Sequence, residues 1–337
     1  EHSAQDLVAK SCETTPHPIR SRSPVVAQPD YGGRRCGCSS ASRPSSSAQN
    51  GLPLALATPS LFTYYQSPPR LNGALVVGVS QSGQSPDIVS VLEEGRKQNC
   101  LTLAITNVPD SPLAQAADFV LDIQAGSEKA VAATKTYTAE LMAVAMISAA
   151  LSNSEEHWNE LSSVSKWAEQ ALALDHHIAQ MTQRYRYMSQ CVVLGRGFNY
   201  ATAFEWALKL KELTYLIAEP YSSADFQHGP IAMVEGGFPV LAVAPRGKVH
   251  DSMRDMLTRL RKEKDAELVV ISDDPDTLAA LMGVGFLTFF LFERVLVLHH
   301  RDDPGLERLL APVAGLLEAA ERDAGEGDER GVDADRP

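Results

Sequence analysis

The chain has 337 residues, of which 44% are hydrophobic, and a formal net charge of -12 at pH 7. This length allows one large hydrophobic core or two of ordinary domain size, and we expect two. The sequence is acidic and shows no stripe of basic residues, which argues against nucleic acid as a partner. A bound phosphate would therefore have to be held by local dipoles and hydroxyl groups.

The cysteines and the apolar segments indicate the compartment. The five cysteines show neither a CxxC pair nor the Cys and His spacing of a zinc site, so we expect reduced thiols and no bound metal. They are Cys12, Cys36, Cys38, Cys100 and Cys191. Residues 1–30 lack the layout of a secretory signal, and the longest apolar run, residues 278–292, is short for a bilayer. We therefore expect a cytoplasmic protein without a membrane partner, in which this run is buried core.

Both ends of the chain have the composition of irregular segments. Residues 1–50 contain ten Ser, five Pro and six Lys or Arg residues. Such a composition buries too little apolar surface to offset the entropy that is lost on ordering. We therefore predict no regular structure in residues 1–50, and a solvated acidic tail at residues 318–337.

From residue 51 the sequence alternates between strand and helix patterns. Residues 74–79 form a continuous apolar run that predicts a buried strand, and a helical pattern follows at residues 88–98. Further strands are predicted at residues 101–106 and 119–123, and an alanine-rich helix at residues 131–151. This alternation is typical of a parallel sheet with helices on both faces.

The alternation restarts after a predicted helical segment between about residue 152 and about residue 187. The strands expected next are residues 191–194, 239–244 and 268–272, and the helices are residues 201–217 and 249–264. The predicted fold class is therefore α/β, with two open, doubly wound units of three layers each. We place the first unit at residues 51–155 and the second at residues 156–317.

Polar residues follow the first predicted strand in the sequence Ser80-Gln-Ser-Gly-Gln-Ser-Pro-Asp87. Gly83 lets the backbone approach a ligand, Ser85 is expected to cap the next helix, and Pro86 suits the first helical position. Together with the N–H groups of the helix start, the side chains that form a neutral cradle for a phosphate dianion are those of Ser80, Gln81, Ser82 and Ser85. The spacing fits neither a Walker loop nor a dinucleotide fingerprint. The alternative is an ordinary capped turn.

Three charged residues share one face of the helix predicted at residues 201–217. Glu205, Lys209 and Glu212 follow one another at steps of four and three. Apolar side chains cover most of the remaining surface, which predicts a largely buried helix. Buried charges are costly unless they are paired, so the pattern favours a functional group. The alternative is an ordinary surface ion pair.

A histidine lies beside a predicted helix end in the sequence Ser222-Ser-Ala-Asp-Phe-Gln-His-Gly-Pro230. Ser222 is typical of a helix N-cap, and Gly229 followed by Pro230 is typical of a helix end. His228 could act there as an acid or base near neutral pH. The alternative is a structural histidine.

Five segments occur in the order and spacing of the sugar isomerase (SIS) domain family, which the chain resembles from about residue 51 to about residue 272. Besides residues 80–85, 207–212 and 228–230, they are Ala125-Gly-Ser-Glu-Lys-Ala-Val-Ala-Ala-Thr-Lys135 and Gly195-Arg-Gly197. Within the family the chain is similar to the isomerase half of glutamine:fructose-6-phosphate aminotransferase and to stand-alone glucosamine-6-phosphate deaminases.

The resemblance implies a site for a sugar 6-phosphate that is shared between the subunits of a homodimer, with no cofactor. The implied substrate-binding residues are Ser80, Gln81, Ser82, Ser85, Val131, Ala132 and Ala133. Glu212 would move a proton between adjacent sugar carbons, and Lys209 and Glu205 would position it. His228 would reach the site from the partner subunit and assist ring opening.

Four features depart from the family. Ala133 stands where the family usually has a hydroxyl group. No glutaminase domain precedes the first unit, so we expect no use of glutamine. Residues 36–40, Cys-Gly-Cys-Ser-Ser, leave the family's first strand and one phosphate contact without a clear equivalent. Residues 333–337 resemble the lead-in to the family's closing tail, and the lysine of that tail is missing.

The predicted activity is conversion of glucosamine 6-phosphate to fructose 6-phosphate and ammonia, or the reverse reaction with free ammonia. One alternative is simple aldose-ketose isomerisation of a sugar phosphate. The other is a non-catalytic SIS module that binds a sugar phosphate and regulates a partner. The presence of Glu212 and His228 favours an enzyme, whereas the unusual ends favour a binding module.

Overall fold

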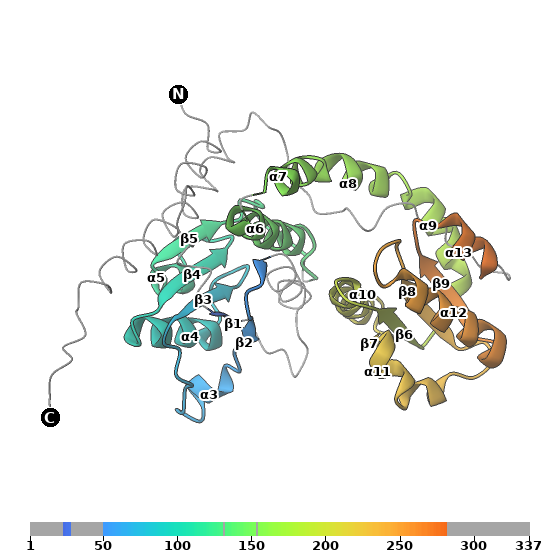
Figure 1. Cartoon of the computed structure of the whole chain (residues 1–337), viewed down its shortest axis with the longest axis horizontal. Helices are drawn as coiled ribbons and strands as arrows, with labels where there is room; N and C mark the ends of the chain where they lie inside the picture. Colours follow the sequence, from blue (N-terminus) through green and yellow to red (C-terminus); the bar gives the residue numbers. More distant parts are fainter. Residues whose placement is uncertain (1–22, 28–49, 131, 153, 282–337) are drawn as a thin grey trace, which may run out of the picture.

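The computed structural model describes residues 23–27 and 50–281, apart from Val131 and Asn153. The strands form two parallel sheets, which lie before and after a run of helices (Figure 1). This confirms the predicted fold class, an α/β protein with two parallel sheets flanked by helices.

The first sheet contains parallel strands in the order β2-β1-β3-β4-β5. They are β1 (Ser23–Ala27), β2 (Ala55–Leu56), β3 (Ala74–Val79), β4 (Leu101–Thr106) and β5 (Phe119–Asp122). Strands β3 and β4 have the bounds that the sequence predicts, and every residue of β3 is buried. Strands that are buried on both faces are continuous apolar runs, which is why these two were predictable.

Helices cover both faces of this sheet. They are α3 (Ser60–Thr63), α4 (Pro86–Lys97), α5 (Pro112–Gln115) and α6 (Lys135–Ser152). Val76 of β3 packs with Ile88 and Leu92 of α4 in one core cluster. Its neighbour Val77 belongs to the opposite cluster with Met142 of α6. Successive side chains of a strand point to opposite faces, so one apolar run supplies both cores.

The segment predicted to be irregular, residues 1–50, contains a strand. Strand β1 pairs in parallel with β3, from Ser23 opposite Ala74 to Ala27 opposite Gly78, and with β2 on its other side. The prediction is wrong for these residues because a composition averaged over a Ser-rich and Pro-rich stretch hides five residues whose hydrogen bonds come from neighbouring strands. Residues 1–22 and 28–49 lie outside the described part of the chain, as do residues 282–337.

Short helices connect the two sheets. They are α7 (Glu155–Ser162), α8 (Val164–Leu172), α9 (Asp175–Thr182) and the 3-10 helix η2 (Gln183–Tyr185). Helices α7 and α8 run from the end of α6 toward the second sheet (Figure 1). Trp158 and Trp167 pack against the first core, whereas Ile178 and Met181 of α9 pack against the second.

The second sheet repeats the topology of the first. Its parallel strands have the order β7-β6-β8-β9, which matches β2-β1-β3-β4. They are β6 (Gln190–Gly195), β7 (Ile217–Ser222), β8 (Pro239–Val243) and β9 (Glu267–Ile271). Its helices are α10 (Asn199–Thr214), α11 (Ser223–Gln227), the 3-10 helix η3 (Pro230–Met233), α12 (His250–Lys264) and α13 (Pro275–Ala280). The predicted repeat of one open α/β unit is therefore confirmed.

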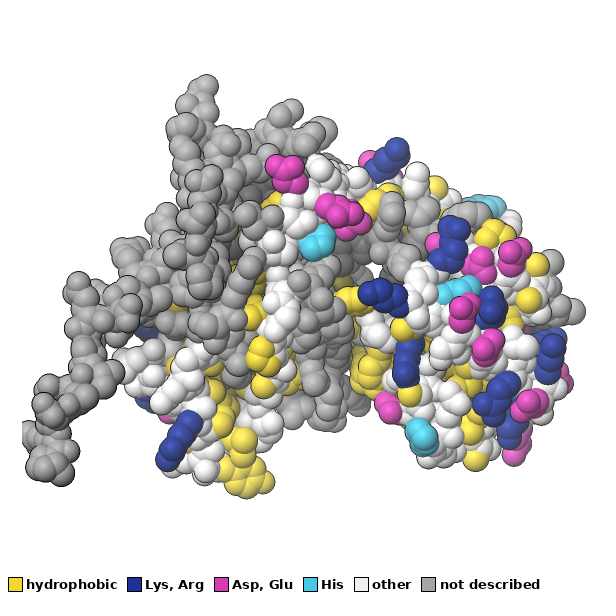
Figure 2. All heavy atoms as spheres, viewed as in Figure 1, with side chains coloured by type: hydrophobic (Ala, Val, Ile, Leu, Met, Phe, Trp, Pro, Cys, Tyr) yellow, Lys and Arg dark blue, Asp and Glu magenta, His cyan; other side chains and the backbone are white. Residues whose placement is uncertain are grey.

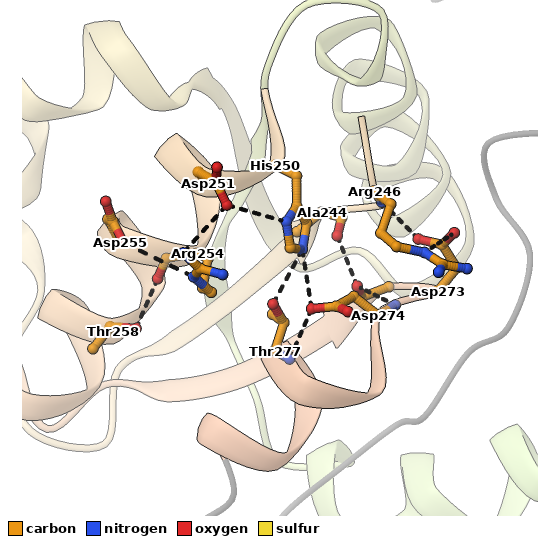
Figure 3. A network of polar contacts seen from close by, with 11 residues as sticks. Ala244, Arg246, His250, Asp251, Arg254, Asp255, Thr258, Asp273, Asp274 and Thr277 are labelled. Carbon is orange, nitrogen blue, oxygen red and sulfur yellow. Dashed lines mark hydrogen bonds and ion pairs between the residues drawn. The ribbon is translucent and has the colours of Figure 1, made fainter. Parts of the chain in front are cut away.

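A polar network joins the loop after β8 to the loop after β9 (Figure 3). The backbone N–H of Arg246 donates to Asp273 at 2.6 Å, and its Nε donates to the same carboxylate at 3.1 Å. Asp274 caps α13 by accepting the Thr277 N–H at 2.9 Å. His250, which is buried, contacts the Thr277 hydroxyl through Nε2 at 3.1 Å. These contacts fix the start of α12 against the start of α13.

The described surface carries mixed charge. In Figure 2 basic and acidic side chains are interspersed over the helices of the second sheet, on the right of the view. Two of the pairs on α12 are Arg254 with Asp251, at 3.2 Å, and Arg259 with Glu263, at 3.8 Å. Within the described residues, no helix combines the length and the apolar character needed to cross a membrane.

Candidate functional site

The loop at residues 80–85 connects β3 to α4 at the edge of the first sheet where the strands have their carboxyl ends. Ser80 is buried, and its backbone N–H donates to Ile105 O at 3.0 Å. Its hydroxyl accepts the Gly83 N–H at 3.2 Å. Gly83 has a φ of +61°, and a Cβ at this position would overlap the Ser111 Oγ. A residue with a side chain would therefore clash with Ser111 at the start of α5 and would adopt an unfavourable φ, so glycine is required there.

Hydroxyl and N–H groups meet at the start of α4. Pro86 occupies the first helical position as predicted. Ser85 stands at the N-cap position, but its side chain makes no capping hydrogen bond, so the predicted cap is wrong. Because Pro86 already fixes the first helical φ, the helix start does not depend on the cap. The half-buried hydroxyls of Ser82 and Ser85 and the N–H groups of the first turn can therefore bind an anion.

The segment after β5 was predicted to line the sugar. Ala132 is buried and Ala133 is half-buried, while Val131 lies outside the described residues. The predicted helix start at residue 131 is wrong, because α6 begins at Lys135. The carboxyl ends of parallel strands meet at one edge of a sheet, so this segment lies at the same edge as the loop after β3.

Glu128 holds the second half of this segment. Its carboxylate accepts hydrogen bonds from the N–H groups of Ala130, Thr134 and Thr136 and from the Thr136 hydroxyl, at 3.4, 3.2, 3.5 and 3.2 Å. Desolvation acts to raise the pKa of Glu128, but these hydrogen bonds outweigh it and hold the pKa below its ordinary value. The carboxylate binds donors at the start of α6, which explains why the helix begins later than its alanine-rich sequence predicts.

Glu205, Lys209 and Glu212 lie together on α10, as their spacing predicts. Lys209 Nζ is 3.3 Å from Glu205 Oε1 and 3.0 Å from Glu212 Oε2. Their side chains are 10%, 21% and 36% exposed in chain order, so the group runs from the interior to the surface. Burial alone would lower the pKa of Lys209, but the two carboxylates outweigh it and raise the pKa. Lys209 is therefore a fixed cation that holds Glu212.

Helix α10 is shorter and less buried than predicted. It ends at Thr214, the chain turns at Tyr215 with a left-handed φ of 60°, and β7 begins at Ile217. The predicted helix to residue 217 is wrong at this end, because a turn formed by a tyrosine gives no glycine signal in the sequence. Phe204 and Trp206 are half-buried rather than buried. The cost of burying a charge therefore favours a functional role for Glu205, whereas Glu212 is exposed and incurs no such cost.

His228 follows α11 and is exposed. Ser222 caps this helix by accepting the Ala224 N–H, as predicted. The backbone N–H of His228 donates to Asp225 O at 3.1 Å, and Gly229 has a φ of +142°. The helix therefore ends as the sequence predicts, and the imidazole is open to solvent.

The structure places the predicted residues in two groups on different sheets. The loop at residues 80–85 and the segment with Ala132 lie at the first sheet, and the charged group on α10 lies at the second. His228 belongs to neither group. Sequence reasoning missed Glu128 and Asn107. Asn107 directly follows β4 at the same edge of the sheet. Ligands of parallel sheets bind at this edge, so a polar residue at the end of a predicted strand could have been recognised as a candidate.

The described residues contain no group of three or more His, Cys, Asp and Glu side chains that could hold a metal ion. Cys100 and Cys191 are buried. Burial raises the pKa of Cys191 to about 12, against a smaller opposite effect of Lys211. A thiol of this kind is protonated at neutral pH, so Cys191 is a core residue and no nucleophile. The other three cysteines lie outside the described residues.

A model of the SIS domain matches residues 68–150 and 187–283, which together make up more than half of the chain. The chain belongs to the SIS domain family. The first range covers β3 to β5 and most of α6, and the second covers β6 to β9 with their helices, so the chain contains two SIS units.

Curated relatives of this SIS chain include two glutamine–fructose-6-phosphate aminotransferases (isomerizing). The protein from Methanothermobacter thermautotrophicus is 32% identical over 288 residues, which cover 85% of this chain and 46% of that protein. The protein from Methanosarcina acetivorans is 33% identical over 222 residues, which cover 63% and 36%. The chain thus spans less than half the length of these relatives.

Solved structures include the C-terminal domain of glucosamine-fructose-6-phosphate aminotransferase from Francisella tularensis. It is 24% identical, with a TM-score of 0.71 over 99% of this chain and 94% of that one. At this identity the likeness supports the SIS fold alone.

Proposed function

We propose that the chain binds a sugar 6-phosphate and converts glucosamine 6-phosphate to fructose 6-phosphate and ammonia, with Glu212 as the base. One observation supports the proposal: in a SIS chain, the loop at residues 80–85 and the start of α4 offer hydroxyl and N–H groups at the carboxyl edge of the first sheet. The carboxylate that is paired with Lys209 on α10 supplies the second requirement, a group that can move a proton.

The cradle suits a phosphate in an acidic protein. The net charge of -12 repels anions at a distance, so a phosphate must be held by short-range donors. Residues 80–85 offer hydroxyls beside the N-terminus of a helix that runs from Pro86 to Lys97, and hydrogen bonds to a phosphate are charge-assisted. Sugars without a phosphate lack this anchor and should bind poorly.

The proposed reaction begins with the transfer of a proton from the sugar to the enzyme. In the open-chain sugar, Glu212 would take the proton from carbon 2, the electrons of that C–H bond would form a double bond to carbon 1, and the aldehyde oxygen would take up a proton. The product of this step is an enolamine, and its protonation at carbon 1 gives an iminium ion at carbon 2. Water hydrolyses the iminium ion to the ketone and ammonia and releases the proton. Lys209 would position Glu212, and His228 of a second subunit would assist ring opening.

The variant Glu212→Gln tests the base. It keeps the shape of the side chain and cannot accept the proton, so kcat should fall by about two to four orders of magnitude while KM changes little. Ammonia release and deuterium uptake from heavy water into the sugar are the two measurements. Glu219→Gln is the matched control, since Glu219 is also exposed and pairs with a lysine of α10, Lys211, at 3.0 Å.

The outcomes separate the alternatives. Deuterium uptake that persists in Glu212→Gln would show that the base lies elsewhere. Isomerisation of a sugar phosphate without ammonia would support a simple aldose-ketose isomerase. Tight binding by the wild-type chain without any turnover would support a regulatory SIS module.

A further inference from the structure

Asn107 contacts both parts of the proposed sugar-phosphate site. It is the first residue after β4, and its backbone N–H donates to Gln81 O in the phosphate loop at 3.1 Å. Its side-chain Oδ1 accepts the Ala125 N–H at 2.9 Å, and its Nδ2 donates to Gly126 O at 2.7 Å. One residue therefore joins the loop after β3 to the segment after β5.

The chemistry of the amide fixes how Asn107 lies. Its oxygen faces an N–H group and its nitrogen faces a carbonyl, and a flipped amide would place donor against donor and acceptor against acceptor. The partners are backbone groups of consecutive residues, Ala125 and Gly126. The side chain thus holds a short stretch of main chain from two sides, which a single hydrogen bond would not do.

The stretch that Asn107 holds begins the segment at residues 125–136. Gly126 has a left-handed φ of +68°, and Gln124 has one of 49°. Beyond this turn the segment is held by its own contacts, which include Lys135 Nζ donating to Ser127 O at 2.6 Å and the hydrogen bonds to Glu128. Local contacts therefore set the shape of the segment, while Asn107 ties it to the loop that would hold the phosphate.

We propose that Asn107 is a positioning residue that sets the separation between the phosphate loop and the sugar-lining segment, and so couples phosphate recognition to sugar recognition. The inference rests on the proposed function, and it deepens that function by naming what selects a hexose 6-phosphate over a phosphate alone. A ligand that bridges the two parts gains from both only when their spacing matches its length. Loss of Asn107 leaves the phosphate loop formed, because the backbone N–H to Gln81 remains.

The measurement is the ratio of two affinities, for glucosamine 6-phosphate and for inorganic phosphate, determined by calorimetry on the full chain. In Asn107→Ala we expect the sugar phosphate to bind about ten-fold or more weakly while inorganic phosphate binds nearly as in the wild type. The ratio therefore falls by about the same factor. Asn107→Asp keeps the acceptor for Ala125, loses the donor to Gly126 and should lower the ratio too. Because glucosamine 6-phosphate carries an ammonium group that inorganic phosphate lacks, the added charge acts differently on the two ligands, and Asn107→Ala is the decisive variant.

Gln98→Ala is the matched control. Gln98 also makes a two-sided amide contact with the main chain, accepting the Leu71 N–H at 2.7 Å and donating to Pro69 O at 3.1 Å. Its Nε2 donates in addition to Glu94 Oε1 at 2.9 Å. It follows the C-terminus of α4 at the opposite edge of the sheet, away from the proposed site. Its replacement should lower the free energy of unfolding about as much as Asn107→Ala does and leave the affinity ratio unchanged.

Two results would overturn the inference while leaving the proposed function intact. One is an unchanged ratio in both Asn107 variants. The other is an equal loss of affinity for both ligands, which would make Asn107 a general support of the phosphate loop. If the wild-type chain binds no sugar phosphate at all, the proposed function itself fails, and the role of Asn107 falls with it.

Discussion

Ser80 and Ser82 differ in what their hydroxyl groups do, although both lie in the loop after β3. Ser80 is buried and accepts a hydrogen bond from Gly83, so it shapes the loop. Ser82 is half-buried and accepts the Gln84 N–H at the long distance of 3.4 Å. Both hydroxyls still have a hydrogen to donate, but Ser80 is buried and only Ser82 is accessible to a ligand. We therefore expect Ser82 to contact the ligand and Ser80 to hold the loop.

The variant Ser82→Ala tests this division. It should weaken glucosamine 6-phosphate binding by about 1 to 3 kcal/mol, because a charged acceptor loses one donor. The free energy of unfolding should change little. Ser90→Ala is the control, because the Ser90 hydroxyl already donates to Asp87 O within α4 at 2.8 Å. Its loss should not weaken ligand binding. Calorimetry that shows equal affinity for glucosamine with and without its phosphate would remove the cradle from the mechanism.

Among the elements, α13 depends on one carboxylate for its start. Asp274 accepts the Thr277 N–H at 2.9 Å and faces His250 Nε2 at 3.4 Å (Figure 3). The hydrogen bond from Thr277 is the main cause that holds the pKa of Asp274 below its ordinary value, with help from the charges of His250 and Arg246 and against some desolvation. A carboxylate of this kind stabilises the fold in its ionised form.

Replacement of Asp274 by Asn should therefore destabilise the protein in a pH-dependent way. Because the pKa in the folded state is lowered, the stabilisation is complete above the ordinary Asp value of about 3.9 and disappears as the pH falls through the lower folded value. Urea unfolding at about pH 7 and about pH 3 can be followed by Trp206 fluorescence in chains that carry Trp158→Phe and Trp167→Phe. The destabilisation by Asp274→Asn should shrink at acid pH. The exposed Asp251→Asn variant serves as the control, and a difference that stays constant with pH would contradict the prediction.

Some elements could be predicted from the sequence, and others could not. Strands β3 and β4 were predictable because burial on both faces leaves an uninterrupted apolar run. Strand β7 was missed, since Glu219 and Pro220 interrupt its pattern and an edge strand tolerates both. The Ser and Gly pattern predicted a loop between β3 and α4, which the structure has, and phosphate binding by this loop stays a prediction. Asn107 was missed although it directly follows β4, whose end could be predicted. Glu128 was beyond reach, because no sequence pattern marks a carboxylate that binds backbone N–H groups of its own segment.

At the scale of the whole molecule, each sheet has its own interior. The buried residues of the first sheet's clusters come from residues 52–164, and those of the second come from residues 191–281. Two units that share no core can unfold separately. The proposed site draws its phosphate loop from the first unit and Glu212 from the second, so a ligand that contacts both can bind only while both are folded.

The three tryptophans of the chain allow this coupling to be measured. Trp158 and Trp167 pack on the first core and Trp206 on the second, so Trp206→Phe reports the first unit, and the double variant Trp158→Phe with Trp167→Phe reports the second. Glucosamine 6-phosphate at about a hundred times its Kd should stabilise both units, by about 2.7 kcal/mol where unfolding abolishes binding. At the same ligand concentration, adding Ser82→Ala should reduce the stabilisation of both units together. A shift confined to the first unit would place the ligand on the phosphate loop alone, and Glu212 would then need to reach its substrate in another subunit or have no part in the reaction.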